Sequence, residues 1–234
     1  MSEFQYQINR NKIHGAGMRQ WLHYFRWKRS MRSGAGSMRD RMPWVTFDAI
    51  DVLRRNLNKQ SKVFEFGGGG STLFFMDHAG EVVTAEHNCD WFDALKTALS
   101  ESEKKRWTGI LRQAEEGRIT ESLDAAVPEH YFTADENYRY CHFSAYVCSI
   151  DQFADEYFDV VLVDGRSRPA CLIHALLKLK VGGLLVLDNS DREYYLEKTM
   201  QRIQEKYVPV ISNQGAGPYA VEFSRTTIWR RIRK

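Results

Sequence analysis

Residues 63–72 read VFEFGGGGST, so an apolar segment that carries a carboxylate runs directly into four consecutive glycines. Four adjacent glycines lose much backbone entropy on folding, and such a run therefore needs a physical reason. The usual reason is a ligand that lies against the main chain, where a side chain would intrude. If a helix begins after the glycines, its free N–H groups also lie beside that ligand. We interpret the run as a ligand cradle, with a flexible surface loop as the alternative.

The residues around the glycines exclude two common nucleotide-binding loops. A phosphate-binding P-loop ends in Gly-Lys-Ser/Thr, whereas Ser71 and Thr72 follow glycine directly. A dinucleotide loop that begins at Gly67 has Gly or Ala at the position that Thr72 occupies. No Lys or Arg lies between Glu65 and Glu81, and Glu65 itself would repel a pyrophosphate. A cationic ligand with an amino group and a sugar suits these charges better, and S-adenosylmethionine is such a ligand.

Acidic or amide side chains also close three other apolar segments of the chain. Two of these segments, FDVVLVD and LLVLD, are continuous enough to be strands buried on both faces of a sheet. The closing residues are Glu86-His87, Asp164-Gly165-Arg166-Ser167-Arg168 and Asp188-Asn189. Open parallel sheets bind their ligands beyond the carboxyl ends of the strands. One such acid alone is commonly a helix cap, but the coincidence of four strand ends predicts a ligand site.

At these positions the chain resembles the class I S-adenosylmethionine-dependent methyltransferases. Their first motif, acid-x-Gly-x-Gly-x-Gly, is matched by residues 65–71 (EFGGGGS), with Ser71 in place of the third glycine. The resemblance covers the chain from about Pro43 to the C-terminus. It implies an α/β fold, with a doubly wound, mostly parallel seven-stranded sheet, helices on both faces and a reversed last strand.

The resemblance also implies which residues bind S-adenosylmethionine. It implies that Glu65 orients the methionine end, that residues 67–69 pass under the cofactor, and that Glu86 holds both ribose hydroxyls. Independently, a carboxylate suits a vicinal diol, because it can accept two charge-assisted hydrogen bonds. The complete expected set is Glu65, Phe66, Gly67, Gly68, Gly69, Ser71, Thr72, Glu86, His87 and Asp164.

Methyl transfer needs alignment, exclusion of water and, for an acceptor that carries a proton, a base. We expect Asp164, which ends a central strand, to be the base or the positioning group. Arg166 and Arg168 are permanently charged and would repel a sulfonium, so we expect them to point outward to an anionic acceptor. Surface pairing with acids is the alternative. The expected catalytic residues are Asp164 and Arg166, and the expected acceptor-binding residues are Arg166, Arg168, Asp188 and Asn189.

Asp164, Asp188 and Asn189 also resemble the metal-binding trio of catechol-type O-methyltransferases, whose oxygen ligands suit Mg²⁺. Those enzymes carry a lysine shortly after the first aspartate, and Ser167 stands at that place here. We therefore predict no metal site. The four cysteines show no CxxC spacing, which favours reduced thiols in a cytoplasmic protein over disulfides or a Cys/His metal cluster.

Alternating strand and helix patterns must position these residues. Strands are predicted at 62–66, 81–86, 109–111, 158–164, 184–188, 208–211 and within 220–230. Helices are predicted at 47–57, from the glycines to residue 78, after Asn88, from Pro169 to Gly182-Gly183, and over 191–207. The expected buried side chains of the helix after Asn88 are Trp91, Phe92, Leu95 and Leu99. This alternation implies a parallel sheet that is covered on both faces.

A length of 234 residues fits one sizeable domain, which we place at residues 43–234. Residues 1–42 are expected to form a basic helical extension or lid, since residues 1–44 hold nine Lys or Arg and two acids. A helix over 18–32 can dock on the domain, cover the site or bind an anionic surface. The aromatic stretch 115–146 is either a wall of the substrate pocket or a loop that packs its rings on the sheet. No apolar run approaches the roughly 18 residues of a membrane span.

These observations favour an S-adenosylmethionine-dependent methyltransferase that acts on a small, anionic molecule, at oxygen rather than nitrogen. An aminopropyltransferase of the same fold is one alternative, but it needs an acidic polyamine channel, whereas Arg166 and Arg168 make this rim basic. A nucleic-acid-binding or RNA-methylating protein is another, through the basic N-terminus and the C-terminal run RRIRK. The net charge of only +3 and the lack of a compact basic motif disfavour nucleic acid. A homo-oligomer is compatible with the sequence.

Overall fold

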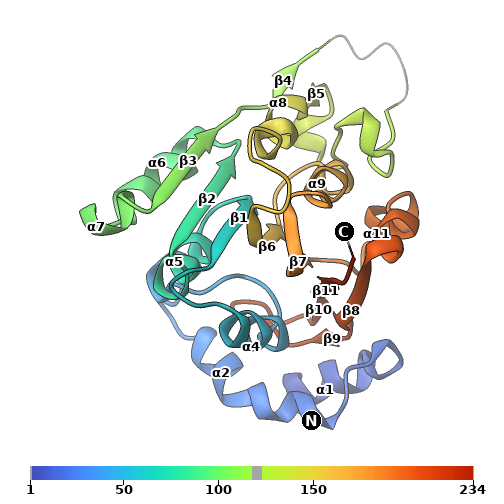
Figure 1. Cartoon of the computed structure of the whole chain (residues 1–234). Helices are drawn as coiled ribbons and strands as arrows, with labels where there is room; N and C mark the ends of the chain where they lie inside the picture. Colours follow the sequence, from blue (N-terminus) through green and yellow to red (C-terminus); the bar gives the residue numbers. More distant parts are fainter. Residues whose placement is uncertain (1, 118–122, 234) are drawn as a thin grey trace.

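A seven-stranded sheet forms the centre of the computed structural model, which describes residues 2–117 and 123–233 (Figure 1). The strand order is β3-β2-β1-β6-β7-β11-β8. The strands are β1 (Lys62–Phe66), β2 (Glu81–Glu86), β3 (Trp107–Leu111), β6 (Phe158–Val163), β7 (Leu179–Leu187), β8 (Tyr207–Ile211) and β11 (Thr227–Arg231). β11 runs antiparallel to both of its neighbours, β7 and β8. The predicted fold is therefore confirmed, and its reversed strand lies one place in from the edge.

The central strand β6 shows why the sheet must be covered on both faces. Val160 and Leu162 belong to the apolar core on one face, and Val161 and Val163 belong to the core on the other. All four side chains are fully buried. Alternation is the geometry of a strand, so a continuous apolar run fills two cores at once.

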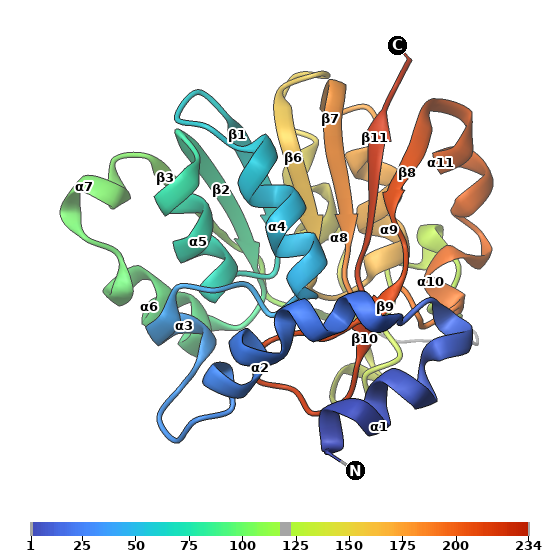
Figure 2. The ribbon, with the colours of Figure 1, turned by 90° about the horizontal axis from the view of Figure 1, so that it is seen from below.

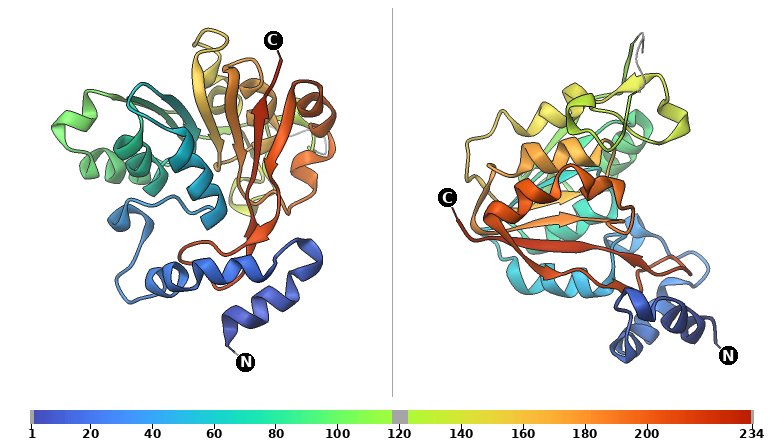
Figure 3. Two further views of the ribbon diagram at one scale, coloured as in Figure 1. Left: turned by 60° about the horizontal axis from the view of Figure 1, so that its bottom comes forward. Right: turned by 90° about the vertical axis from the view of Figure 1, so that its right-hand side faces the viewer.

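Helices cover the two faces of the sheet, as Figure 3 shows from the side. On one face lie α4 (Phe47–Asn56), α5 (Gly70–His78) and α6 (Cys89–Ala98), which share the first core. On the other lie α8 (Ser144–Val147), α9 (Arg168–Ala175) and α11 (Met200–Lys206), which share the second. The remaining helices are α1 (Glu3–Arg10), α2 (Tyr24–Ser30), α3 (Ser37–Asp40), α7 (Glu101–Lys104) and α10 (Tyr194–Glu197). Short strand pairs add β4 (Glu115–Glu116) with β5 (Cys141–His142), and β9 (Gln214–Gly215) with β10 (Ser224–Arg225).

The N-terminal helices share the core that α4 and α5 build on the sheet. Phe4 is fully buried, and its ring contacts Trp21, Tyr24, Trp27 and Phe223 at centroid distances of 5.1 to 5.4 Å. Figure 2 shows α1 and α2 beyond the carboxyl ends of the parallel strands, next to β9 and β10. The predicted helix over 18–32 is present in two parts, a 3₁₀ segment (Met18–His23) followed by α2.

Two predicted helices differ from those observed. The helix after Pro169 ends at Ala175 instead of Gly182, and β7 begins at Leu179. The glycines form a bulge inside β7, where Gly182 has a φ of +88° and the register with β6 shifts. The predicted helix over 191–207 is also divided into α10 and α11.

Among the described residues, no helix combines the length and the apolar character that crossing a membrane requires.

Candidate functional site

A cleft of about 450 Å³ lies where β1, β2 and β6 end, a volume within the usual range for small-molecule sites. Its lining comes from the loops that follow these three strands and from the aromatic insertion. The lining residues are Gly67, Gly68, Glu86, His87, Asn88, Asp90, Trp91, Tyr138, Asp164, Gly165 and Arg166. The structure thus brings together three of the four strand ends that the sequence singled out.

Contacts within the protein partly explain why this loop requires glycine. Gly67 has a φ of +90°, and a Cβ there would come within 2.9 Å of the Gly165 Cα. A Cβ on Gly68 would meet Thr84 at 2.6 Å, and one on Gly70 would collide with the carbonyl oxygens of residues 37 and 42. The loops after β1 and β6 therefore touch main chain to main chain, and this contact forms the floor of the cleft.

Glu65 lies beneath the glycine loop and does not line the cleft. Its side chain is fully buried, and it accepts hydrogen bonds from the hydroxyls of Ser71 at 2.6 Å, Thr84 at 2.7 Å and Thr72. Thr72 also accepts the amide of Gly69 at 3.0 Å. Burial raises the pKa of Glu65 to about 7, against the lowering effect of these hydroxyls. The geometry gives Glu65 the task of bracing the loop.

Four other residues of the expected cofactor set also lie outside the cleft lining. Phe66 is buried in the core below it, with its ring 5.6 Å from that of Tyr146. Gly69, Ser71 and Thr72 form the turn into α5, and both hydroxyls of this turn point to Glu65. These residues shape the loop from behind.

Glu86 is a carboxylate of the cleft lining that main-chain amides hold in place. It accepts the amide of Gly68 at 3.0 Å through one oxygen, and the amides of His87 and Asn88, each at 2.8 Å, through the other. Burial acts to raise the pKa of Glu86, but hydrogen bonds from His87, Asn88 and Gly68 outweigh it and hold the pKa below its ordinary value. Glu86 is therefore ionised at neutral pH, and the oxygen that binds only Gly68 has room for another donor.

Trp91 has a role that the sequence did not indicate. It was predicted to be buried, but it is 42% exposed. Its indole nitrogen donates to the carbonyl oxygen of Gly68 at 2.7 Å, and its ring lies beside Gly69. Asn88 caps α6 as predicted, by accepting the Trp91 amide. Because Trp91 falls in the first turn of that helix, the cap places the indole at the mouth of the cleft.

Arg168 lies at the inner end of the site and ties two strand ends together. Its guanidinium donates to the carbonyl oxygens of Asp164 at 2.8 Å, Gly165 at 3.0 Å and Asp188 at 2.5 Å. It also pairs with the Asp164 carboxylate at 3.1 Å and contacts the Asn189 side chain at 3.4 Å. The prediction that Arg168 points outward was wrong: its side chain is 7% exposed. The strand-end acids attract it inward, where it satisfies carbonyl groups that are otherwise buried.

The two aspartates held by Arg168 differ in exposure. Asp164 lines the cleft with 24% of its side chain exposed, whereas Asp188 is buried and accepts the Thr226 hydroxyl at 2.6 Å. Burial raises the pKa of both, and the guanidinium of Arg168 opposes the rise. Asp188 and Asn189 lie behind Arg168, outside the cleft lining.

This arrangement does not fit a magnesium ion bound by Asp164, Asp188 and Asn189. A guanidinium already contacts all three residues, and it supplies the positive charge that a metal would bring. The guanidinium of Arg168 is thus the cation that lies among Asp164, Asp188 and Asn189.

Arg166 joins the cleft to the aromatic insertion. It pairs with Asp135 at 2.9 Å, and its guanidinium lies 5.6 Å from the centre of the Tyr138 ring. Its Nε is buried and has no hydrogen-bond partner among the described residues. Both interpretations of the insertion are met in part, because Tyr138 lines the cleft while Phe143 and Tyr146 pack in the core of the sheet.

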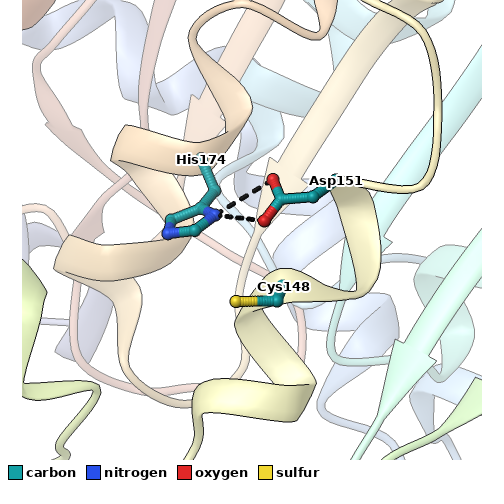
Figure 4. A group of neighbouring side chains, drawn as sticks. All are labelled: Cys148, Asp151 and His174. Carbon is teal, nitrogen blue, oxygen red and sulfur yellow. Dashed lines mark hydrogen bonds and ion pairs between the residues drawn. The ribbon is translucent and has the colours of Figure 1, made fainter.

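A second group of polar side chains lies outside the cleft, on α9 and the segment before β6 (Figure 4). The ligand atoms of Cys148, Asp151 and His174 lie within 4.8 Å of one another. Sequence spacing gave no sign of this group, because residues far apart in the chain form it. Hydrogen bonds account for it: His174 contacts Asp151 at 2.8 Å and the Tyr131 hydroxyl at 3.3 Å. All four cysteines are free thiols, as predicted.

Comparison with known proteins supports the fold. No protein-family model matches the chain, and no curated protein sequence does. Many solved structures superpose on it, among them the following three. Cofactor-bound Rv0187 from MTB has a TM-score of 0.55 at 14% identity, over 100% of this chain and 99% of that one. A candidate methyltransferase from Streptococcus mutans, in complex with S-adenosylhomocysteine, has a TM-score of 0.53 at 14% identity, over 79% and 96%. An rRNA methylase from Streptococcus thermophilus has a TM-score of 0.52 at 12% identity, over 80% and 95%.

The chain has the class I S-adenosylmethionine-dependent methyltransferase fold. In this methyltransferase fold, the cleft at the ends of β1, β2 and β6 is the place where ligands of open α/β sheets bind. Identities of 12 to 14% leave the residues of the site to be judged on their own geometry.

Proposed function

We propose that the protein is an S-adenosylmethionine-dependent methyltransferase and that the cofactor binds in the cleft around Glu86. The observation that carries this proposal is the ionised Glu86 carboxylate, which lies beside bare main chain and has an acceptor site to spare. Glu86, Asp90 and Asp164 line the cleft, and Arg166, the one arginine that the described residues place in the lining, pairs with Asp135. Such a surrounding favours a ligand with positive charge and hydroxyl donors over a pyrophosphate.

The types and positions of the residues that line the cleft suit S-adenosylmethionine. Glu86 would hold the ribose hydroxyls, and the main chain of Gly67 and Gly68 would lie under the nucleoside. Trp91 and Tyr138 would flank the base, since aromatic faces suit a purine ring. Asp164 would face the cationic end. When bound, this cofactor supplies a methyl group activated by its sulfonium.

The acceptor that we propose is a small, anionic molecule, methylated at oxygen. Asp164 supports a hydroxyl acceptor, because burial raises its pKa and a carboxylate of this kind can take the proton that the hydroxyl loses. Arg166 supports an anion, because its guanidinium lines the cleft with an unsatisfied nitrogen. Arg168 acts as a positioning residue, because its guanidinium holds Asp164 in place.

Ligand-dependent unfolding tests the cofactor. The protein is melted alone and with S-adenosylmethionine, S-adenosylhomocysteine, NAD or ATP, and the last two serve as controls. A ligand at about 100 times its Kd stabilises the folded state by about 2.7 kcal/mol. We expect both adenosyl sulfur compounds to raise the melting temperature. A rise with NAD or ATP alone would refute the proposal.

An aminopropyltransferase remains the second candidate, because the acidic cleft also suits decarboxylated S-adenosylmethionine. Arg166 opposes it, since a polyamine would meet a guanidinium at the rim. Transfer of label from the methyl group of S-adenosylmethionine, as opposed to transfer from the aminopropyl group of the decarboxylated compound, separates the two reactions.

A further inference from the structure

A second hollow, outside the cofactor cleft, gathers arginine side chains from four parts of the N-terminal half. It has a volume of about 520 Å³ and lies between α2, the turn that follows it, α3 and α4. Its charged lining consists of Arg26, Arg29, Arg32, Arg39, Arg54 and Asp40. The excess of four positive charges in this one hollow exceeds the net charge of +3 of the whole chain.

Two of these arginines are held in place by the protein. Arg26 donates to both oxygens of Asp51, at 2.8 and 2.9 Å, and lies 4.5 Å from the centre of the Phe47 ring. Arg39 donates to the carbonyl oxygen of Gly34 at 2.7 Å and so closes the turn between α2 and α3. Arg26 of α2 and Arg39 of α3 are therefore held in fixed positions at the hollow.

Four of the five arginines of the hollow have no acidic partner among the described residues. Within the part of the chain that the structure describes, Arg29, Arg32, Arg39 and Arg54 form no ion pair. The one acid, Asp40, accepts the Tyr219 hydroxyl at 2.9 Å and an amide at 3.2 Å. Guanidinium groups that converge on one concavity repel one another, and a bound anion relieves that repulsion.

Phosphate is the anion that these side chains fit best. A guanidinium presents paired N–H groups that match two phosphate oxygens, and several guanidiniums can share one phosphate group. A volume of about 520 Å³ has room for more than one such group together with the molecule that carries it.

One side of the hollow packs against the start of α5, which follows the glycine loop. Residues 37–42 form one of its sides, and the carbonyl oxygens of residues 37 and 42 lie against Gly70, the first residue of α5. Gly70 lies two residues after Gly68, which lines the cleft. Arg41, in the same segment, is fixed to Asp77 of α5 at 2.8 Å. The segment 37–42 would therefore lie between a phosphate bound in the hollow and the glycine loop of the cofactor cleft.

We propose that this arginine hollow is a binding site for phosphate groups, carried either by a phosphorylated small molecule or by a nucleic-acid backbone. The site stands on its own contacts and does not require the methyl transfer proposed above. Docking on the core does not explain why the N-terminal segment is basic, whereas phosphate binding does.

Binding of inorganic pyrophosphate and of a short single-stranded RNA to the full chain tests the proposal. The double variant Arg29→Ala/Arg32→Ala removes two unpaired arginines from exposed positions. The matched control, Lys198→Ala/Arg202→Ala, removes the same charge from side chains that are 52% and 53% exposed near α11. The single variant Arg54→Gln probes the hollow from α4. Melting temperatures confirm that each variant is folded.

We expect the wild type and the control to bind pyrophosphate alike, and the double variant to bind it at least about tenfold more weakly. Arg54→Gln should weaken binding in the same direction. If RNA is the natural source, RNA binds more tightly than pyrophosphate, and the double variant makes the slope of log K against log salt less steep by about 1.4. No binding of either probe by the wild type, or equal losses in the double variant and the control, overturns the proposal. Binding of S-adenosylhomocysteine is measured on the same proteins, so that failure of this site and failure of the cofactor cleft are told apart.

Discussion

Glu65 offers the sharpest test of how the glycine loop is held. Its carboxylate is fully buried among three hydroxyl donors, and its pKa rises from an ordinary 4.5 to about 7. At about 1.4 kcal/mol for each pH unit, ionisation of Glu65 in the folded protein costs about 3 kcal/mol relative to the unfolded chain. Glu65→Gln keeps the shape of the side chain, and the hydroxyl of Ser71 can turn to accept from the amide.

The pH dependence follows from this shift. Below about pH 4.5 both states hold the proton, and the contribution of Glu65 to stability is complete. Between pH 4.5 and about 7 the unfolded chain has released its proton while the folded protein retains it, so stability falls as the pH rises. The loss ends above pH 7. Glu65→Gln cannot lose a proton and escapes this fall.

Urea unfolding of the wild type and of Glu65→Gln between pH 4.5 and 8 measures the effect. We expect the free energy of unfolding of Glu65→Gln, minus that of the wild type, to increase by about 3 kcal/mol as the pH rises from 4.5 to 8. The control, Glu101→Gln, alters a side chain that is 86% exposed and should show no comparable trend. A difference between Glu65→Gln and wild type that stays constant with pH would show that Glu65 is not buried as described.

Three further predictions concern the cleft and its supports. Glu86→Ala should weaken binding of S-adenosylhomocysteine on the order of tenfold to a hundredfold, as measured by calorimetry; an unchanged Kd would remove Glu86 from the cofactor site. Arg168→Met leaves Asp164 and Asp188 uncompensated and should lower the free energy of unfolding by roughly 3–5 kcal/mol in urea titrations, whereas a loss below about 1 kcal/mol would mean that solvent screens this pair. Cofactor binding should be unchanged by EDTA, because a guanidinium occupies the corner where Mg²⁺ would bind; a dependence on added Mg²⁺ would contradict that assignment.

The sequence predicted the strands that carry the site because each is a short, mostly apolar run with a polar end. The bounds of β1 and β2 agree with their predicted ranges, 62–66 and 81–86. A short, nearly continuous apolar run is a local feature of the sequence, and so it can be read without knowledge of the neighbouring strands. Only the first part of β7, residues 179–183, was missed, because this part pairs around a glycine bulge.

The orientation of charged side chains was harder to predict, because it depends on contacts between distant segments. Arg168 and Glu65 were both expected to face a ligand. Instead, each satisfies polar groups of the protein: the first serves strand-end carbonyl oxygens, and the second serves hydroxyls of the next helix. Trp91 was misjudged for the same reason, since only the folded loop shows that Gly68 offers it a carbonyl oxygen. A polar side chain next to a motif indicates a site, but packing decides which way it points.

A crystal structure with S-adenosylhomocysteine tests the central claim most directly. We predict that the nucleoside lies on the main chain of Gly67 and Gly68, with both ribose hydroxyls on Glu86 and the homocysteine end toward Asp164. An unoccupied cleft at saturating ligand, or a nucleoside whose ribose does not touch Glu86, would contradict the account.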